Sequence, residues 1–205
     1  FVAFFLFFRN FGLNVSIGKF IPEFKVKNKY SQIKSAILSV LGFQFIISII
    51  FISLTWYFSD FLALNYFGDI RASILLRILS FYFLTSIFFK NLSSFFRGFQ
   101  KNKLFSLIDP VRNILILFSI LILLYFGFGI YAPVYSYVLV GLVMLVLFLP
   151  FVFWTYDFRK YKFVKFRQTF KNLLFFGIPV FGAGFGGKFI SYFDTLMLVH
   201  FGNLE

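Results

Sequence analysis

The feature that most constrains the fold of this chain is a succession of six apolar stretches, most of them longer than 20 residues. A helix of about 20 residues crosses the ~30 Å hydrocarbon core of a bilayer. Backbone groups in lipid must be paired within the protein, and these stretches lack the apolar–polar alternation of barrel strands. The sequence therefore predicts an all-α fold, a polytopic transmembrane helix bundle. The predicted spans are 1–20, 33–58, 70–96, 104–126, 131–155 and 170–201.

The loops between these spans differ in charge, and the difference alternates along the chain. The sequence carries 20 Lys and Arg against 7 Asp and Glu. Most of the basic residues lie in the first, third and fifth loops, near 19–34, 97–103 and 157–171, while the second and fourth loops hold few or none. Basic loops of membrane proteins stay in the cytoplasm. We therefore expect a multi-pass protein of the cell (cytoplasmic) membrane, with these three loops cytoplasmic and the lipid bilayer as its partner.

The composition argues against several other classes of protein. The basic residues lie in loops between apolar spans and do not form one face of a recognisable nucleic-acid-binding module. We therefore expect no nucleic acid partner. The chain has no Cys and a single His, which argues against thiolate chemistry and His-cluster metal sites. Its acidic residues form no pair suited to general acid–base chemistry. We therefore expect no enzyme, metal site or cofactor in this chain.

Charges inside the predicted spans are the first candidates for a functional site. A charged side chain deep in a bilayer is costly and needs a cavity, a ligand or a partner. Arg112 has Asp109 three residues before it as an ion-pair partner, and Arg77 lies near enough to a span end to reach the interface. For the deeper cations the alternatives are a structural ion pair and an aqueous cavity that holds an anionic ligand. The four residues predicted to line a cationic, substrate-binding cavity are Arg9, Arg77, Lys90 and Lys188.

The last span is rich in residues that weaken a helix. Gly182, Gly184 and Gly187 fit a dinucleotide-binding pattern as text, but no strand precedes them, so we reject that interpretation. Pro and Gly allow a helix to bend, whereas small residues four apart allow close static packing of two helices. Asp194, further along the same span, is a candidate for ion coupling, with a structural ion pair as the alternative. The predicted hinge consists of Pro179, Gly182, Gly184, Gly186 and Gly187.

Four segments resemble, in order and spacing, the motifs of one known family. Polysaccharide-export flippases end their second helix with a Gly-Leu … Arg-Phe-Ile-Pro-Glu-Tyr pattern, which residues 12–24 resemble as Gly-Leu-Asn-Val-Ser-Ile-Gly-Lys-Phe-Ile-Pro-Glu-Phe. Their Leu-Arg-Gly-Leu-Gln segment after the fourth helix is similar to Ser-Phe-Phe-Arg-Gly-Phe-Gln-Lys at 94–101. Residues 173–179 and 192–198 resemble the start and the Asp-bearing middle of their seventh helix. Lys19 departs from the pattern, because the family usually has Arg there.

The chain is thus similar to the oligosaccharide (Wzx-like) flippases of the multidrug/oligosaccharidyl-lipid/polysaccharide exporter superfamily. The resemblance implies two six-helix lobes around a V-shaped cavity. Residues 1–165 would form the first lobe without its first helix, and 166–205 would form the first helix of the second lobe, so that the chain is an N-terminal-half fragment. It further implies alternating-access flipping of a lipid-linked oligosaccharide with an anionic diphosphate head. Glycosyltransferases or a polymerase of the same pathway would be partners.

Two other functions stay open at this stage. A cation-coupled multidrug exporter of the same superfamily would place carboxylates within a lobe, whereas the spans here hold few acids and several bases. A membrane-embedded sugar polymerase or ligase would carry a large outer loop with catalytic Arg or His, whereas the second and fourth loops are short. The balance of these features favours the flippase, because a cationic interior suits an anionic substrate.

Overall fold

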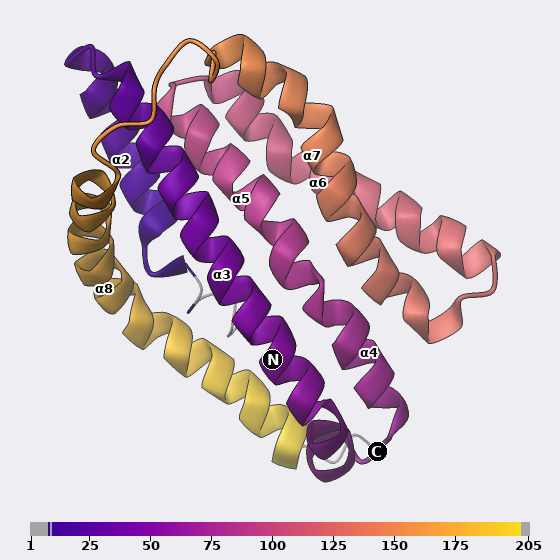
Figure 1. Cartoon of the computed structure of the whole chain (residues 1–205). Helices are drawn as coiled ribbons and strands as arrows, with labels where there is room; N and C mark the ends of the chain where they lie inside the picture. The colour runs from indigo at the N-terminus through magenta and orange to yellow at the C-terminus, as the bar shows by residue number, and fades with distance from the viewer. Residues whose placement is uncertain (1–7, 9, 202–205) are drawn as a thin grey trace.

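The computed structural model describes residues 8 and 10–201, and beyond Gly187 it describes the side chains only in part. Within this range the regular elements are all helical (Figure 1), which confirms the predicted all-α fold. A π-helical turn at Ala63–Phe67 follows the helix that ends at Leu62, and a 3-10 turn at Gly129–Tyr131 precedes the helix that begins at Ala132. The helices are α2 (Leu13–Val26), α3 (Tyr30–Leu62), α4 (Arg71–Ser80), α5 (Tyr82–Gly98), α6 (Asn102–Tyr125), α7 (Ala132–Thr155) and α8 (Phe166–Phe201).

Four helical segments of the described chain are long and apolar enough to cross a membrane, and they match the second to fifth predicted spans. These segments are Tyr30–Phe67, Arg71–Gly98, Asn102–Tyr125 and Gly129–Thr155. The third predicted span is interrupted at Phe81, which separates α4 from α5. The last predicted span, 170–201, lies within α8, which is a single uninterrupted helix.

The first predicted span, 1–20, is wrong as one continuous helix. Phe11 and Gly12 have positive φ angles of 41° and 70°, and α2 begins only after them. Gly adopts such angles without strain, and the turn brings the backbone against α8, where a Cβ on Gly12 would lie 2.1 Å from the carbonyl oxygen of Gly177. Because α2 continues to Val26, Lys19 and Lys25 lie on the helix, and the first basic loop is shorter than predicted.

Small polar side chains lie among the buried apolar ones between the helices, whereas the exposed faces carry many large apolar side chains. On α3 the buried polar residues are Ser35, Ser39, Gln44, Ser48, Thr55 and Ser59. The other faces of α3 expose large apolar side chains, among them Phe45, Ile46, Ile50 and Leu54. Lipid chains are as apolar as Leu, so small and polar residues mark helix contacts in a bilayer. The distribution is that of a bundle built for lipid.

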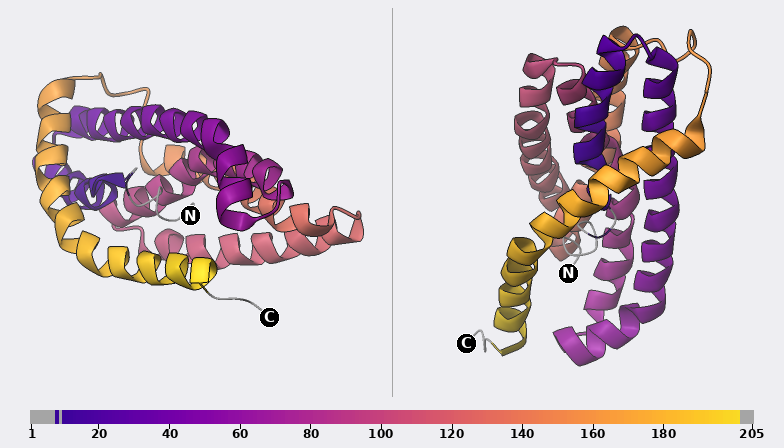
Figure 2. Two further views of the ribbon diagram at one scale, coloured as in Figure 1. Left: turned by 90° about the horizontal axis from the view of Figure 1, so that it is seen from below. Right: turned by 90° about the vertical axis from the view of Figure 1, so that its left-hand side faces the viewer.

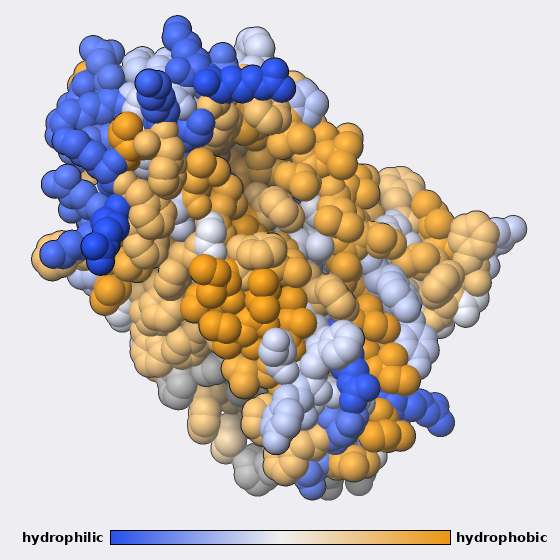
Figure 3. All heavy atoms as spheres, viewed as in Figure 1, coloured by the Kyte–Doolittle hydropathy of each residue, from blue (hydrophilic) through white to orange (hydrophobic). Residues whose placement is uncertain are grey.

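The three basic connections lie at one end of the bundle. The α2–α3 turn, the α5–α6 turn and the α7–α8 linker meet there (Figure 1). Hydrophilic atoms gather at this end over a largely apolar visible face (Figure 3). We call this the basic end. From it, α8 curves as it passes α2 and α3, both of which it contacts (Figure 2).

Candidate functional site

The predicted cavity residue Arg77 lies at the end opposite the basic end and is held in an ion pair. Its Nη2 atom lies 2.9 and 2.8 Å from the two carboxylate oxygens of Asp60, and its Nε donates to Ser59 Oγ at 2.7 Å. Asp60 also accepts a hydrogen bond from Ser73. Besides cavity lining, the sequence predicted only that Arg77 could reach the interface and not this partner, which engages the guanidinium with both of its carboxylate oxygens.

The structure describes some of the other intramembrane cations and not others. Arg112 lies 3.9 Å from the Asp109 carboxylate, which confirms the predicted pair, and its guanidinium stacks over Phe89 at 4.8 Å. Lys90 is half-buried on α5. Arg9 lies outside the described residues, and the side chains of Lys188 and Asp194 lie outside the described part of α8. Cavity lining by these residues and ion coupling by Asp194 therefore stay predictions.

Several predicted hinge glycines face open space, although Phe181 and Phe185 of the same stretch of α8 contact the ring of Phe8. The helix runs without a break through Pro179. A Cβ added at Gly182, Gly184 or Gly186 would meet no described atom within 4 Å. These glycines are therefore not required for packing within the described chain. Two roles remain for them: bending of α8, or contact with a helix outside the described chain.

Close packing of α8 occurs instead at Gly177, where α8 crosses α2. A Cβ on Gly177 would lie 2.7 Å from the carbonyl oxygen of Phe11 and 3.0 Å from Ser16 Oγ. Ser16 Oγ donates to the Leu173 carbonyl at 2.9 Å, and the Lys19 ammonium lies 3.8 Å from the centre of the Phe176 ring. We call this set of contacts the α2–α8 crossing. It fixes the start of α8 on the bundle.

A chain of amide side chains joins α2, α3 and α5 in the interior. Asn91 Nδ2 donates to Gln44 Oε1 at 2.7 Å, and Gln44 Nε2 donates to Asn14 Oδ1 at 3.0 Å and Asn10 Oδ1 at 3.3 Å. We call these four residues the amide relay. Sequence reasoning missed Gln44 and Asn91 because it searched the spans for charge. An uncharged amide in an otherwise apolar span was the available signal.

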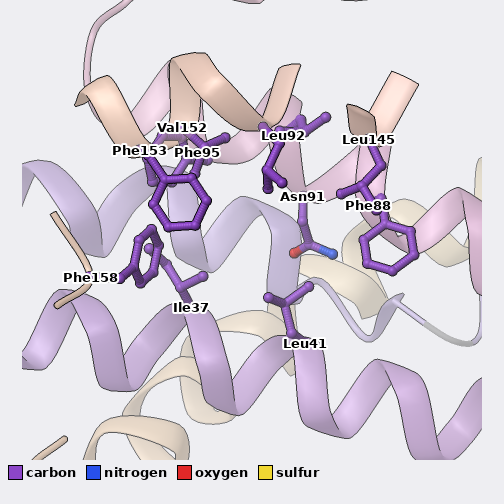
Figure 4. A pocket seen from close by; sticks show the side chains of 11 residues that line it. Ile37, Leu41, Phe88, Asn91, Leu92, Phe95, Leu145, Val152, Phe153 and Phe158 are labelled. Atoms are coloured by element: carbon purple, nitrogen blue, oxygen red, sulfur yellow. The ribbon is translucent and has the colours of Figure 1, made fainter. Parts of the chain in front are cut away.

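The amide relay ends at a groove of about 310 Å³ between α3, α5 and α7. Apolar side chains line it, and Asn91 projects toward Ile37 and Leu41 (Figure 4). Asn91 is 7% exposed, and its Oδ1 atom is buried with no hydrogen-bond partner among the described residues. Because Nδ2 also donates to the Ile87 carbonyl at 2.8 Å, the acceptor end of the amide is the unpaired one. The surface of the groove is apolar and accommodates a hydrocarbon chain, and the Oδ1 atom lies beneath that surface.

The α7–α8 linker, residues 156–165, is fastened to the start of α3. Lys34 Nζ donates to the carbonyls of Phe158 and Tyr161 at 2.7 and 2.9 Å. Ser35 Oγ donates to the Val164 carbonyl at 2.6 Å and accepts from the Val164 amide at 3.0 Å. We call these contacts the linker clamp. Lys34, predicted as a loop cation, instead caps backbone carbonyls.

A tyrosine strengthens the linker clamp. Tyr156, directly after α7, donates from its hydroxyl to the Tyr30 carbonyl at 2.7 Å. Burial raises the pKa of the Tyr156 hydroxyl above its usual value, so the group remains a donor at physiological pH.

The described residues contain no group of three or more His, Cys, Asp or Glu that could hold a metal ion.

An extensively apolar surface, with several helices long and apolar enough to cross a bilayer, defines a multi-pass membrane protein. The whole chain, residues 1–205, matches the family model described as polysaccharide biosynthesis protein, and the chain belongs to this family. The family resemblance predicted from the motifs is thereby confirmed. The chain is also similar to an uncharacterized membrane protein, MJ1068, of Methanocaldococcus jannaschii, with 29% identity over 211 residues. The match covers 97% of this chain but 42% of that relative's length. No solved structure matches the chain.

Proposed function

We propose that the chain is part of a transporter that flips a lipid-linked oligosaccharide across the cytoplasmic membrane by alternating access. The observation that carries the proposal is membership of a polysaccharide biosynthesis family over the whole length of a chain that folds as a membrane bundle. A transport role requires no chemistry, so we propose that the chain is not an enzyme. The basic end faces the cytoplasm in this proposal, because basic connections are retained there.

The substrate head is the chemical problem that such a transporter must solve. A diphosphate carries negative charge that hydrocarbon does not solvate, and fixed cations in a cavity replace its water shell. Arg9, Lys90 and Lys188 are our candidates for these cations. Arg77 is the weakest of the four, because it contacts a phosphate only by giving up its two bonds to Asp60.

The proposed lobes meet at α8. Residues 1–165 hold the packed bundle, and α8 carries the chain from the linker clamp across α2 into the second lobe. Support for this division comes from the α2–α8 crossing, which holds the start of α8, and from the open surroundings of its glycines. Glycosyltransferases or a polymerase of the same pathway are the proposed protein partners.

The cation hypothesis is tested with Arg9→Ala and Lys188→Ala combined in the whole protein, reconstituted in vesicles with a lipid-linked oligosaccharide. Losing a charge-assisted hydrogen bond costs about 1.5–3 kcal/mol, and about 1.4 kcal/mol corresponds to tenfold. We therefore expect flipping to slow by at least roughly tenfold. Lys29→Ala with Lys103→Ala, which removes two exposed charges at the basic end, should leave the rate unchanged.

Two outcomes would contradict parts of this proposal. Equal rates for both double variants would refute the cationic cavity while leaving transport intact. Absence of flipping by the unmodified protein, together with ion-driven export of organic cations, would replace the flippase by a multidrug exporter.

The hinge hypothesis is tested with Gly182→Ala, Gly184→Ala and Gly186→Ala combined. Each added Cβ has free space, and Ala stabilises a helix interior by roughly 0.5–1 kcal/mol over Gly. We expect a higher unfolding temperature together with slower flipping, because α8 becomes stiffer. Unchanged flipping in a stabilised protein would show that the glycines are not a hinge. A lower unfolding temperature would indicate that they pack against a helix outside the described chain.

A further inference from the structure

A second cavity, unrelated to the predicted intramembrane cations, lies at the basic end. It has a volume of about 470 Å³. Three lysines from three separate segments line it: Lys25 at the end of α2, Lys101 between α5 and α6, and Lys160 in the α7–α8 linker. Aromatic rings form much of the remaining wall. We call this cavity the lysine cleft.

We propose that the lysine cleft binds the phosphate headgroup of an anionic lipid from the surrounding leaflet. Three lysines and one acidic residue, Asp157, line the cleft, so its lining carries a net positive charge. Asp157 is itself turned to the linker backbone, where Oδ1 accepts the Arg159 amide at 2.9 Å. Basic pockets between transmembrane helices at the cytoplasmic side are suited to acidic lipid headgroups.

The surroundings of the lysine cleft favour an amphiphile over a free anion. Tyr30, Tyr156 and Tyr161 are stacked, with Tyr161 centred 5.3 Å from each of the other two rings. Lys101 lies 4.9 Å from the ring of Trp154, a side chain that is 75% exposed at the end of α7. Tyr and Trp in such positions mark the level of lipid headgroups. The cleft therefore opens where phosphates of the bilayer are concentrated.

The apolar groove lies beside the lysine cleft and has the opposite character. Phe158 lines the groove, Tyr156 lines the cleft, and their rings are 4.7 Å apart. Phe95 of the groove likewise contacts Phe99 of the cleft, with ring centres 4.7 Å apart. A lipid presents a charged head and a hydrocarbon chain to two such neighbouring surfaces, whereas a soluble phosphate uses the cleft alone.

A bound headgroup would connect the linker to two segments that the linker clamp does not reach. Lys160 belongs to the linker, and the neighbouring Phe158 and Tyr161 carbonyls are held by Lys34. A phosphate that bridges Lys160 to Lys25 and Lys101 adds a second attachment of the linker, to α2 and to the α5–α6 turn. The bound lipid thus stabilises the path from the bundle to α8.

The experiment measures thermal unfolding of the purified protein in detergent after addition of phosphatidylglycerol or phosphatidylcholine. We expect phosphatidylglycerol to raise the unfolding temperature and to remain bound in native mass spectra. Lys25→Gln, Lys101→Gln and Lys160→Gln combined should lose most of this shift and the bound lipid. The matched control is Lys29→Gln, Lys103→Gln and Lys162→Gln, which removes one exposed lysine from each of the same three regions outside the cleft.

Several results would overturn the lipid site. An equal shift in both triple variants would mean diffuse attraction to the basic end. The same shift from inorganic phosphate or pyrophosphate in phosphatidylcholine would assign the cleft to a soluble anion. If the triple variant does not purify, the three single variants must each remove part of the shift, and full retention in all three refutes the proposal. Flipping is not measured, so this outcome is independent of the proposed function.

Discussion

Gly177→Ala is expected to destabilise the protein, although Ala is normally the better helix former. The added Cβ would lie 2.7 Å from the Phe11 carbonyl oxygen, a backbone atom in a turn with little freedom. Relieving the clash separates the helices at the α2–α8 crossing and lengthens the bond from Ser16 to the Leu173 carbonyl. Overpacking of this kind costs about 1–3 kcal/mol, which we expect as a lower unfolding temperature in detergent.

The matched control for Gly177→Ala is Gly182→Ala, five residues further along the same helix. Its Cβ meets no described atom within 4 Å, so the helix propensity gain of roughly 0.5–1 kcal/mol is realised in full. The two substitutions should therefore shift the unfolding temperature in opposite directions. A rise in the unfolding temperature for both substitutions would mean that α2 and α8 do not cross at Gly177.

The second large effect is expected from Gln44→Leu, which breaks the amide relay at its centre. Asn91 Nδ2 then keeps a single acceptor, the Ile87 carbonyl, and the Oδ1 atoms of Asn10 and Asn14 lose the donor that Gln44 supplies. Asn10 Oδ1 still accepts from the Asn14 amide, so Asn14 Oδ1 is the atom that loses the hydrogen bond without a described replacement. Leaving such a polar group unpaired costs about 1–3 kcal/mol. Thermal unfolding in detergent measures the loss.

A double variant tests whether the loss of stability comes from the contact between Gln44 and Asn91. Gln44→Leu with Asn91→Leu removes two neighbouring members of the amide relay, so its loss of stability should be smaller than the sum of the two single losses. Asn65→Leu serves as the control, because Asn65 is exposed and its side chain donates to the Phe61 carbonyl one turn earlier in the chain. Additive losses for the double variant would show that Gln44 and Asn91 are not coupled.

The bundle and the grouping of its basic connections could be predicted from the sequence because a bilayer imposes span length and charge placement directly. The sequence predicted the ends of the helices less well. The predicted span 33–58 leaves Asp60 outside the helix, but α3 extends to Leu62, and this extra turn brings the Asp60 carboxylate to Arg77. The break before α2 was also missed, since it depends on Gly177, more than 150 residues further along the chain.

The candidate site was predicted from the charged residues inside the spans. Their positions in the sequence identify the cations but do not show which groups those cations contact. The partner of Arg77 and the polar contacts of Lys34 depend on which helices are neighbours in space. The amide relay carries no net charge, so the search for intramembrane charges passed over it. Arg9, Lys90, Lys188 and Asp194 keep their predicted roles as proposals, to be decided by transport measurements.

The start of α8 is attached to the bundle at two places, the linker clamp and the α2–α8 crossing. Contacts continue past the crossing, because the rings of Phe181 and Phe185 each lie 5.8 Å from that of Phe8. Pro179 lies between Gly177 and these two rings. The part of α8 from Gly177 to Phe201 is about 36 Å long at 1.5 Å per residue. A bend of about 10° at the start of this part would displace its far end by about 6 Å, roughly the pitch of one helical turn.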